Sequence, residues 1–446
     1  SHEPHGSAGA ALRPGDCCQV RLPVAFGGGK PIQCEKSRAM QGGFNMSEST
    51  YRCAIERRCG GCQWLDVPYH DQLARKEQTI KELFTPYLKR GAMLDPIIGM
   101  DTPAGYRNKV IAPFAPGPAP KRKVSSKGHR RPRTSLRYGM YAEHSHRIIP
   151  VEKCLVEAGE ARDIIATVAE MAASYGIEAY DEDNGTGLLR HVMVRTSRFT
   201  GESIVTLVLT SRDIPSRKSF ARELVERQPS VSTVVININD RDTNAVLGDR
   251  EVVIYGRGFI TDVLCGCRFR ISSQSFYQTN PIQTEKLYGR AMELAGLDGG
   301  QRVLDAYCGI GTIGLVASRQ AAEVVGVERN ASAVRDARAN ARLNEINNVR
   351  FAVGDSSEWA LEAARQGEHF DVAFLDPPRS GSSEQFLRSL AELGPRRVVY
   401  ISCGPATQRR DVDLLSDLGY RLERIAPVDM FPHTPHIENI CQLERG

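Results

Sequence analysis

The last third of the chain alternates short apolar runs with segments whose apolar residues recur every three or four positions. The apolar runs have the length and composition of buried strands and cover residues 302–307, 323–328, 349–355, 371–376 and 397–402. Helical patterns follow them over residues 311–319, 331–344, 357–366, 383–393 and 406–418. Strands that alternate with helices are typical of a parallel, doubly wound sheet with helices on both faces. The pattern therefore predicts a Rossmann-like α/β domain over 271–446.

The region before this domain has a different periodicity. Between residues 188 and about 270, apolar and polar positions alternate with a period of two, which predicts a mostly antiparallel sheet. A helix is expected within it near 216–227, and an amphipathic pattern predicts another helix over 69–90. We therefore expect an α+β, β-rich domain over 51–270. The preceding segment 1–50 is rich in glycine and small polar residues, and its pattern assigns it no domain.

The net charge of +5 is modest, but the basic residues are unevenly distributed. Between Thr102 and Ala142 there is no Asp or Glu, while the basic residues are Arg107, Lys109, Lys121, Arg122, Lys123, Lys127, Arg130, Arg131, Arg133 and Arg137. Part of this stretch is an insertion over 115–137 that is too rich in proline, glycine and charge to pack. Uninterrupted positive charge is typical of a surface that binds a nucleic-acid backbone. A solvated loop that only aids solubility is the alternative.

The chain contains no apolar run near the ~18 residues that span a bilayer. We therefore expect a soluble, cytoplasmic protein with no membrane partner, and a monomer in the absence of any signal for assembly.

Twelve cysteines in such a chain favour metal binding or catalysis over a disulfide framework. Cys53, Cys59 and Cys62 form a C-x5-C-x2-C pattern, and Cys154 lies far downstream. Four thiolates can hold either a tetrahedral zinc ion or an iron–sulfur cluster. The spacing alone does not choose between the two.

Polar residues follow the strands of the predicted α/β domain, at the edge where such sheets bind ligands. Gly309 and Gly311 follow the first strand and allow a tight turn before a helix, and Glu328 ends the second strand, where it can hold both hydroxyls of a ribose. Asp355 and Asp376 follow the third and fourth strands. This acidic edge suits a nucleoside with a cationic sulfonium better than a pyrophosphate. The alternative is that the acids only cap helices.

Cys403 comes directly after the fifth strand, in "VVYISCGPAT", where the chain turns. A thiol at this edge becomes a nucleophile if nearby positive charge or the N-terminus of the next helix lowers its pKa. Addition of a thiolate to carbon 6 of uracil would activate carbon 5 toward a methyl donor, and a base would then remove the proton from carbon 5. Glu438, in "DMFPHTPHIENI", is a candidate base, although the sequence alone does not bring it near Cys403.

The stretches "SFYQTN", "FLDPPRSG", "ISCGPAT" and "DMFPHTPHIE" closely resemble motifs of RNA uracil-5 methyltransferases of the TrmA/RlmC/RlmD type. The likeness covers roughly residues 51–446. It implies that Cys403 is the nucleophile and Glu438 the base. It also implies that S-adenosyl-L-methionine is contacted by Gln278, Tyr307, Glu328 and Asp376, with Asp355 near the adenine.

The same resemblance implies further features of the site. Cys53, Cys59, Cys62 and Cys154 would hold a [4Fe–4S] cluster with a structural role, with zinc as the minor alternative. The family usually has Asn after the nucleophile, where this chain has Gly404. We expect the missing side-chain amide to loosen the positioning of the uracil. We also expect His433 and Phe276 to touch the target base.

The substrate class follows from the resemblance as well. It favours 23S ribosomal RNA, with transfer RNA as the alternative, and the uridine would be extruded into the site. Many family members carry an N-terminal TRAM barrel, which segment 1–50 is too short in strands to form, so we expect it to be absent or reduced. Two rivals remain: an amino-group methyltransferase, because of the "DPP" motif, and a non-catalytic RNA-binding factor.

Overall fold

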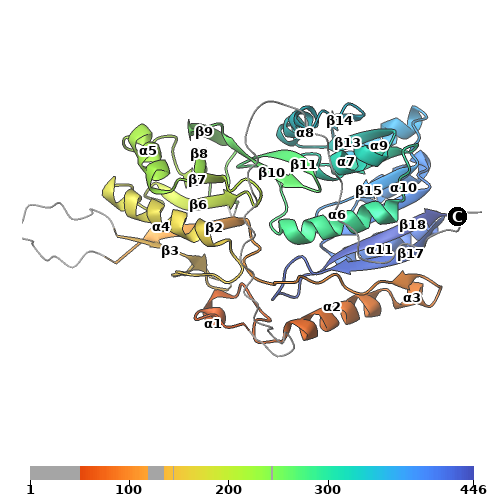
Figure 1. Cartoon of the computed structure of the whole chain (residues 1–446), viewed down its shortest axis with the longest axis horizontal. Coiled ribbons are helices and arrows are strands. Elements are labelled where there is room, and N and C mark those ends of the chain that lie inside the picture. Colours follow the sequence, from red (N-terminus) through yellow and green to blue (C-terminus); the bar gives the residue numbers. More distant parts are fainter. Residues whose placement is uncertain (1–50, 119–134, 144, 243–244) are drawn as a thin grey trace, which may run out of the picture. The chain divides into compact units, whose positions relative to one another are not determined.

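The computed structural model describes residues 51–118, 135–143, 145–242 and 245–446. These residues form a C-terminal sheet of eight strands and a second sheet of six strands, with helices packed on them (Figure 1). The predictions for segment 1–50, including the absent or reduced TRAM barrel, lie outside the described residues. So does most of the basic insertion, at 119–134.

The eight-stranded sheet has the order β1-β17-β18-β16-β15-β12-β13-β14. The five predicted strands are all present and mutually parallel: β12 (Arg302–Ala306), β13 (Glu323–Glu328), β14 (Val349–Val353), β15 (Val372–Leu375) and β16 (Arg397–Ser402). The strand order reverses between β12 and β15, which is where doubly wound sheets open a crevice for ligands.

Three further strands complete this sheet. β17 (Tyr420–Val428) and β18 (Glu438–Arg445) form a hairpin-like pair, and β18 is antiparallel to both β16 and β17. The short β1 (Met93–Leu94) extends the sheet parallel to β17. The direction of β18 brings its first residue to the edge at which the parallel strands end.

Helices cover both faces of the sheet, as predicted. One face packs against α6 (Pro281–Ala295), α7 (Thr312–Ala317) and α8 (Ala331–Leu343) in a common apolar core. The other face packs against α9 (Ser356–Arg365), α10 (Glu384–Leu393) and α11 (Pro405–Asp417) in a second core. The predicted Rossmann-like α/β fold is therefore confirmed, and α6 is a helix that the sequence patterns did not predict.

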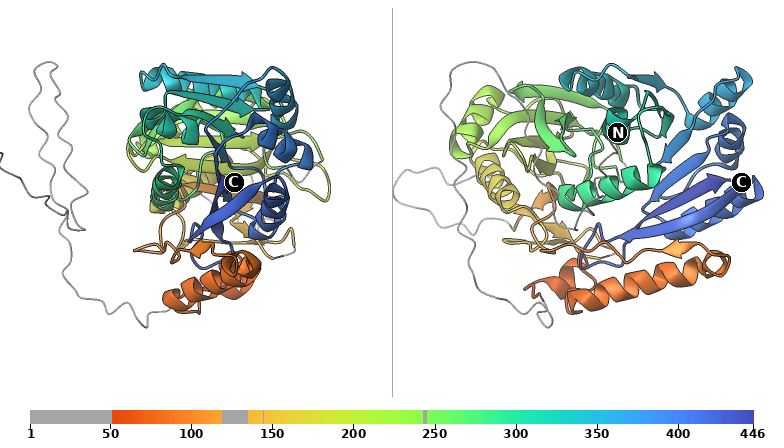
Figure 2. Two further views of the ribbon diagram at one scale, coloured as in Figure 1. Left: turned by 90° about the vertical axis from the view of Figure 1, so that its right-hand side faces the viewer. Right: turned by 45° about the vertical axis from the view of Figure 1, so that its right-hand side comes forward.

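The N-terminal described residues form α1 (Glu56–Cys59), α2 (Tyr69–Leu83) and α3 (Thr85–Leu88). The helix predicted over 69–90 is interrupted at Phe84. Pro86, in the first turn of α3, has no backbone N–H with which to continue the hydrogen bonding of α2. Ile80, Phe84 and Tyr87 are buried in the core shared with α10 and α11. In Figures 1 and 2, α2 accordingly runs alongside the blue strands of the C-terminal sheet.

The second sheet has the order β3-β2-β6-β7-β8-β9. Only β7 and β8 are parallel, because α5 (Arg217–Arg227) crosses over between them, so the prediction of a mostly antiparallel sheet with a helix near 216–227 is confirmed. The strands are β2 (Lys109–Pro116), β3 (Leu136–Tyr138), β6 (Leu189–Thr196), β7 (Ser203–Leu209), β8 (Val231–Ile238) and β9 (Arg250–Tyr255).

Both faces of this sheet are covered near its centre. One face packs on α5 and on α4 (Gly159–Ser174), a helix that the sequence patterns did not predict. On the other face, Ile204 and Val235 share a core with the hairpin of β10 (Phe259–Leu264) and β11 (Cys267–Ser272) and with α6 and α7. The two sheets are thus joined through continuous apolar packing. The domain boundary near residue 270 stays a prediction.

Two short strands, β4 (Met140–Tyr141) and β5 (Ile148–Ile149), form a separate antiparallel pair. Within the described part of the chain, no helix combines the length and the apolar character needed to cross a membrane.

Candidate active site

The carboxyl ends of the parallel strands open onto one large cavity. It has a volume of about 810 Å³ and lies over the crevice between β12 and β15. The cavity brings together seven residues that the sequence singled out from separate strand ends and loops: Gln278, Tyr307, Glu328, Asp355, Asp376, Cys403 and Glu438. Because parallel strands end at the same edge, five of these positions follow directly from the topology.

The glycine turn after β12 is shaped by backbone geometry that few residues adopt. Gly309 and Gly311 have φ values of 54° and 84°, and a Cβ on Gly311 would lie 2.9 Å from the ring of Phe351. The Glu328 carboxylate accepts hydrogen bonds from the backbone N–H of Gly309 (3.2 Å) and Asn330 (2.7 Å). The side chain is thereby fixed at the cavity before any ligand arrives.

Tyr307 has a φ of 69°, which is uncommon for a residue with a side chain and is typical of functional sites. Its hydroxyl lies 3.2 Å from Ser382 Oγ, and its ring packs on Phe386 with centroids 5.3 Å apart. These contacts hold the ring at the wall of the cavity. Asp355 accepts a hydrogen bond from the N–H of Ser357 (2.9 Å), so it caps α9 as well as lining the cavity.

Three carboxyl groups lie at or just behind the cavity wall: Glu438 and Asp305 are buried, and Asp376 is half-buried. Burial raises the pKa of Asp376 to about 7 and that of Asp305, behind the glycine turn, to about 8. Burial and the neighbouring Asp376 raise the pKa of Glu438 well above its usual range, and Arg379 opposes this shift. A cationic ligand would therefore favour the ionised forms of these groups.

Cys403 and Glu438 are adjacent because of the strand register. Ser402, at the end of β16, pairs with Asn439 of β18, so the residue after one faces the residue before the other. Burial, and then the charges of Glu438 and Asp376, raise the pKa of the Cys403 thiol, while a hydrogen bond and charge from Arg379 lower it. The effects that raise this pKa outweigh those of Arg379, so the condition for a lowered thiol pKa is not met in the free protein.

The loop after Cys403 is closely packed. Thr407 of α11 donates a hydrogen bond of 2.9 Å to the backbone carbonyl of Arg379. A Cβ on Gly404 would come within 2.8 Å of the Thr407 hydroxyl and 3.0 Å of that carbonyl. The glycine at this position is therefore matched to its surroundings. Arg379 directly follows "DPP", but sequence reasoning did not connect it with Cys403, on whose thiol it acts in the structure.

The two residues expected to touch a target base differ in position. Phe276 lines the cavity and is 68% exposed, so its ring is available for stacking. His433 is fully buried, and its ring nitrogens contact Gln72 (3.2 Å) and the carbonyl of Pro103 (2.7 Å). The expectation for His433 is therefore wrong: the ring lies in a structural network away from the cavity.

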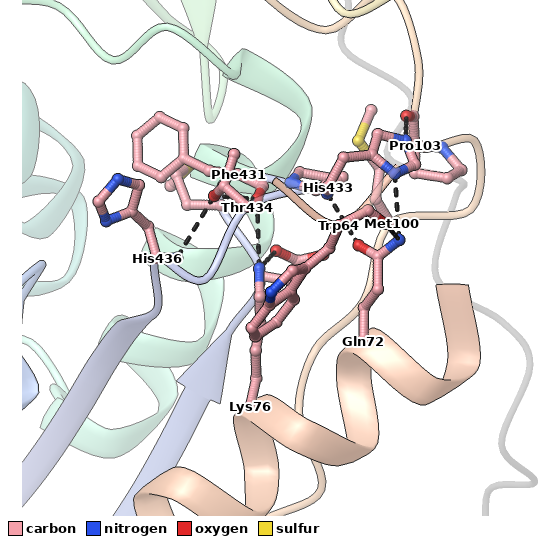
Figure 3. A network of polar contacts seen from close by, with 12 residues as sticks. Trp64, Gln72, Lys76, Met100, Pro103, Phe431, His433, Thr434 and His436 are labelled. Atoms are coloured by element: carbon pink, nitrogen blue, oxygen red, sulfur yellow. Dashed lines mark hydrogen bonds and ion pairs between the residues drawn. The ribbon is translucent and has the colours of Figure 1, made fainter. Parts of the chain in front are cut away.

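This network fixes the segment that leads into Glu438 (Figure 3). Lys76 on α2 forms a buried ion pair with Asp429 (2.5 Å) and donates to the carbonyl of Phe431 (3.2 Å). Gln72, one turn earlier on the same helix, accepts from the backbone N–H of His433 (2.8 Å). Helix α2 therefore holds the chain that runs from β17 to the start of β18.

The four candidate metal ligands also lie together. Cys53, Cys59, Cys62 and Cys154 line a small, apolar cavity of about 30 Å³ between α1 and the loop after β5. Burial raises the pKa of Cys62 to about 12, and the other three thiols contribute to the shift. In the described residues, no group of three or more His, Cys, Asp or Glu side chains is already arranged to hold a metal ion.

Comparison with known proteins places these features in a family. Residues 197–446 match the family model described as tRNA (Uracil-5-)-methyltransferase. A protein named as an uncharacterized RNA methyltransferase from Halalkalibacterium halodurans is 38% identical over 98% of this chain and 94% of that protein. Another, from Caldanaerobacter subterraneus, is 38% identical over 88% of this chain and 84% of that protein.

A solved structure agrees with these matches. The crystal structure of Pyrococcus abyssi tRNA (uracil-54, C5)-methyltransferase in complex with S-adenosyl-L-homocysteine superposes with a TM-score of 0.68. The two proteins are 26% identical, and the match covers 86% of this chain and 85% of the other. The predicted resemblance is confirmed: this chain belongs to the tRNA (uracil-5-)-methyltransferase family and is an S-adenosylmethionine-dependent RNA methyltransferase.

Proposed function

We propose that the protein methylates carbon 5 of a uridine in RNA, with Cys403 as the nucleophile and Glu438 as the base. The observation that carries this proposal is the adjacency of the thiol and the buried carboxyl across β16 and β18, in the cavity that also contains Asp376. An amino-group methyltransferase needs neither group, and a non-catalytic RNA-binding factor has no use for their adjacency.

The reaction uses each group once. The Cys403 thiolate adds to carbon 6 of the uracil, and the electron pair of the 5,6 double bond moves to carbon 5 and the adjacent carbonyl. Carbon 5 attacks the sulfonium methyl group, and the carbon–sulfur bond breaks to release S-adenosyl-L-homocysteine. Glu438 removes the proton from carbon 5, and the returning electron pair expels the thiolate. Arg379 favours the thiolate, and the raised pKa of Glu438 suits a group that must accept a proton.

The cofactor would lie along the strand ends. Glu328, held by the glycine turn, would accept hydrogen bonds from the ribose hydroxyls, and Asp355 would lie near the adenine. Asp376 would balance the sulfonium charge, because it forms no ion pair with any residue that the structure describes. Gln278 and Tyr307 would complete the walls around the methionine part.

The four cysteines would hold a [4Fe–4S] cluster. Four thiols around one apolar cavity are the donor set that such a cluster or a zinc ion requires. When bound, the cluster would cross-link α1 to the loop that contains Cys154. Trp64, which follows these cysteines, donates its backbone N–H to the carbonyl of His433 (3.1 Å), so the cross-link would also stiffen the segment before Glu438.

For the substrate we favour 23S ribosomal RNA, on the resemblance of the motifs described above. Transfer RNA is the competing candidate, and the observation that favours it is the similarity to the Pyrococcus abyssi tRNA (uracil-54, C5)-methyltransferase. In either RNA the uridine must be extruded from its stack to enter the cavity.

Two experiments test the proposal. RNA that contains 5-fluorouridine has no removable proton on carbon 5, so the enzyme should remain covalently joined to it through Cys403, whereas Cys403→Ala should form no adduct. Mass mapping of 5-methyluridine in ribosomal and transfer RNA, from cells with and without the gene, identifies the substrate. Unchanged maps in both RNAs contradict the proposed activity.

A further inference from the structure

Three basic residues gather at one end of β2 and β6 in the second sheet: two lie on these strands and one just before β2. Lys109 of β2 pairs directly with Arg195 of β6 in the antiparallel register, so the two side chains stand next to each other on the same face. Arg107 lies two residues before Lys109, just outside β2, where it forms an isolated bridge with Glu157. Both arginines act electrostatically on Lys109. We call these three residues the basic cluster.

The basic cluster has no acidic partner in the described part of the chain. Arg195 is only 2% exposed and makes a single hydrogen bond, from Nη2 to the carbonyl of Ser275 (3.0 Å), which leaves its Nε and Nη1 without a partner. The Nε of Arg107 is also buried and unpartnered. The nearby Glu157 is already engaged by Arg162 at 2.6 Å.

Such an arrangement is unfavourable for folding. Burial and the two arginines lower the pKa of Lys109 to about 8, which is the shift expected when cations crowd together without a counter-charge. Leaving guanidinium N–H groups buried and unpaired costs further free energy. Buried cations with a structural role normally have an acidic partner, as Lys76 does. A negatively charged ligand would supply the counter-charge that the basic cluster lacks.

The position of the basic cluster indicates where its ligand would lie. Asn108, which separates Arg107 from Lys109, bonds to the backbone of Gln278 and Thr279 at 3.2 and 2.9 Å, and Arg195 bonds to that of Ser275. The segment 275–279 also carries Phe276 at the cavity. No member of the cluster lines the cavity itself. An anion bound here therefore lies beside the cofactor and outside its site.

We propose that Arg107, Lys109 and Arg195 form a binding site for a phosphodiester of the substrate RNA, next to the nucleotide that enters the cavity. This inference rests on the proposed function and identifies where the RNA backbone next to the target uridine would bind. Arg107 and Lys109, which are partly exposed, contact the phosphate. Arg195 lies behind them, adds positive charge and fixes the segment that carries Phe276 and Gln278.

The test is RNA binding by Lys109→Met, with Lys218→Met as the matched control. Lys218 is an exposed lysine on α5, so its substitution removes the same charge from a surface without the cluster. The probe is a labelled single-stranded RNA of about 20 mixed nucleotides, and binding is measured across a salt series without cofactor. We expect Lys109→Met to weaken binding about tenfold and to make the slope of log affinity against log salt shallower by about 0.7.

A stability measurement separates binding from a structural role. Because Lys109 repels its neighbours, Lys109→Met should raise the thermal midpoint of the free protein while weakening RNA binding. Arg107→Gln should behave likewise, and Arg195→Lys should retain part of the binding. A lower midpoint for both Lys109→Met and Arg107→Gln, or salt slopes equal to that of Lys218→Met, overturns the proposal.

Two further outcomes are informative. If Lys109→Met lowers the affinity for S-adenosyl-L-homocysteine, the cluster binds the cofactor carboxylate and the phosphodiester site is wrong. If the salt slope changes as expected but 5-fluorouridine RNA is not trapped by the wild-type protein, the phosphodiester site stands and the proposed uridine chemistry falls.

Discussion

Two buried groups of like charge distinguish this protein, one acidic and one basic. Asp376 and Glu438 line the cavity and Asp305 lies behind its glycine turn; all three have raised pKa values, because burial penalises the carboxylate form. In the basic cluster, burial acts in the opposite direction and lowers the pKa values of Lys109 and Arg195. Each group lacks the counter-charge that the other would supply, and the two face different ligands: a sulfonium and a phosphodiester.

The buried pair of Lys76 and Asp429 shows what the same fold does when charge serves structure. There a cation and an acid meet at 2.5 Å with both side chains fully buried, so the counter-charge is internal. The comparison teaches that the missing partners at the acidic and basic groups mark places where a ligand completes the charge balance. Ligand binding should then stabilise the protein more than the contacts alone would indicate.

The largest effect is expected from replacing the proposed base, Glu438. Glu438→Gln should lower turnover by about 10³-fold, because proton removal from carbon 5 loses its base. The preceding covalent step needs only Cys403, so an adduct with ordinary RNA should accumulate and be visible by denaturing electrophoresis. Glu392→Gln, an exposed carboxyl on α10, is the control and should have normal turnover. Rapid turnover by Glu438→Gln would assign the base elsewhere.

Breaking the internally balanced pair should instead unfold the protein more easily. Lys76→Met leaves Asp429 buried without its cation and should lower the free energy of unfolding by about 3–5 kcal/mol, as measured by urea denaturation. Combining it with Asp429→Asn should recover much of the loss, because the uncompensated charge is gone. A loss below about 1 kcal/mol in the single variant would mean that water reaches the pair.

The link between Asp376 and the sulfonium can be tested with two ligands that differ by one charge. Asp376→Asn should weaken binding of S-adenosyl-L-methionine by about 10- to 100-fold and that of the uncharged S-adenosyl-L-homocysteine far less. Titration calorimetry measures both affinities. An equal loss for the two ligands would show that Asp376 does not sense the sulfonium.

Asp376 should also make both the stability of the protein and its affinity for S-adenosyl-L-methionine depend on pH. Because the pKa of Asp376 is about 7 in the free folded protein, against an ordinary value of 3.8, the folded state holds the extra proton between these values. The contribution of Asp376 to the free energy of unfolding therefore falls as pH rises from about 4 to 7. Affinity for S-adenosyl-L-methionine should rise as pH increases through 7, and Asp376→Asn should flatten this profile.

The smallest effect is expected at the exposed ring beside the cavity. Phe276→Leu removes a stacking surface of the kind that is worth about 1–3 kcal/mol per base, but partly replaces its apolar area. We expect KM for RNA to rise about fivefold with kcat unchanged, in steady-state methylation assays. Phe199→Leu, at another exposed phenylalanine away from the cavity, should leave KM unaltered.

The α/β architecture and its acidic edge could be predicted because local periodicity determines the strands and parallel topology then gathers their ends. The contacts between residues far apart in the sequence could not be predicted, because they depend on which strands pair and in which register. Glu438 reaches Cys403 only through the register of β18, and Arg195 sits in an apolar strand that gave no sign of its partner on β2. His433 was expected to touch the target base, yet contacts with α2 hold its ring in the interior.

The reversed direction of β18 has a consequence for how the reaction centre tolerates change. Since Ser402 and Asn439 are matched by a backbone ladder, the spacing of sulfur and carboxylate does not depend on how many residues connect them. Additional residues at the turn around Gly419, between α11 and β17, should be absorbed without altering the chemistry. Deleting one residue inside β18 would turn the carboxylate to the opposite side of the sheet. The chain should therefore tolerate insertions in the turn around Gly419, whereas the number of residues in β18 cannot change without moving the carboxylate.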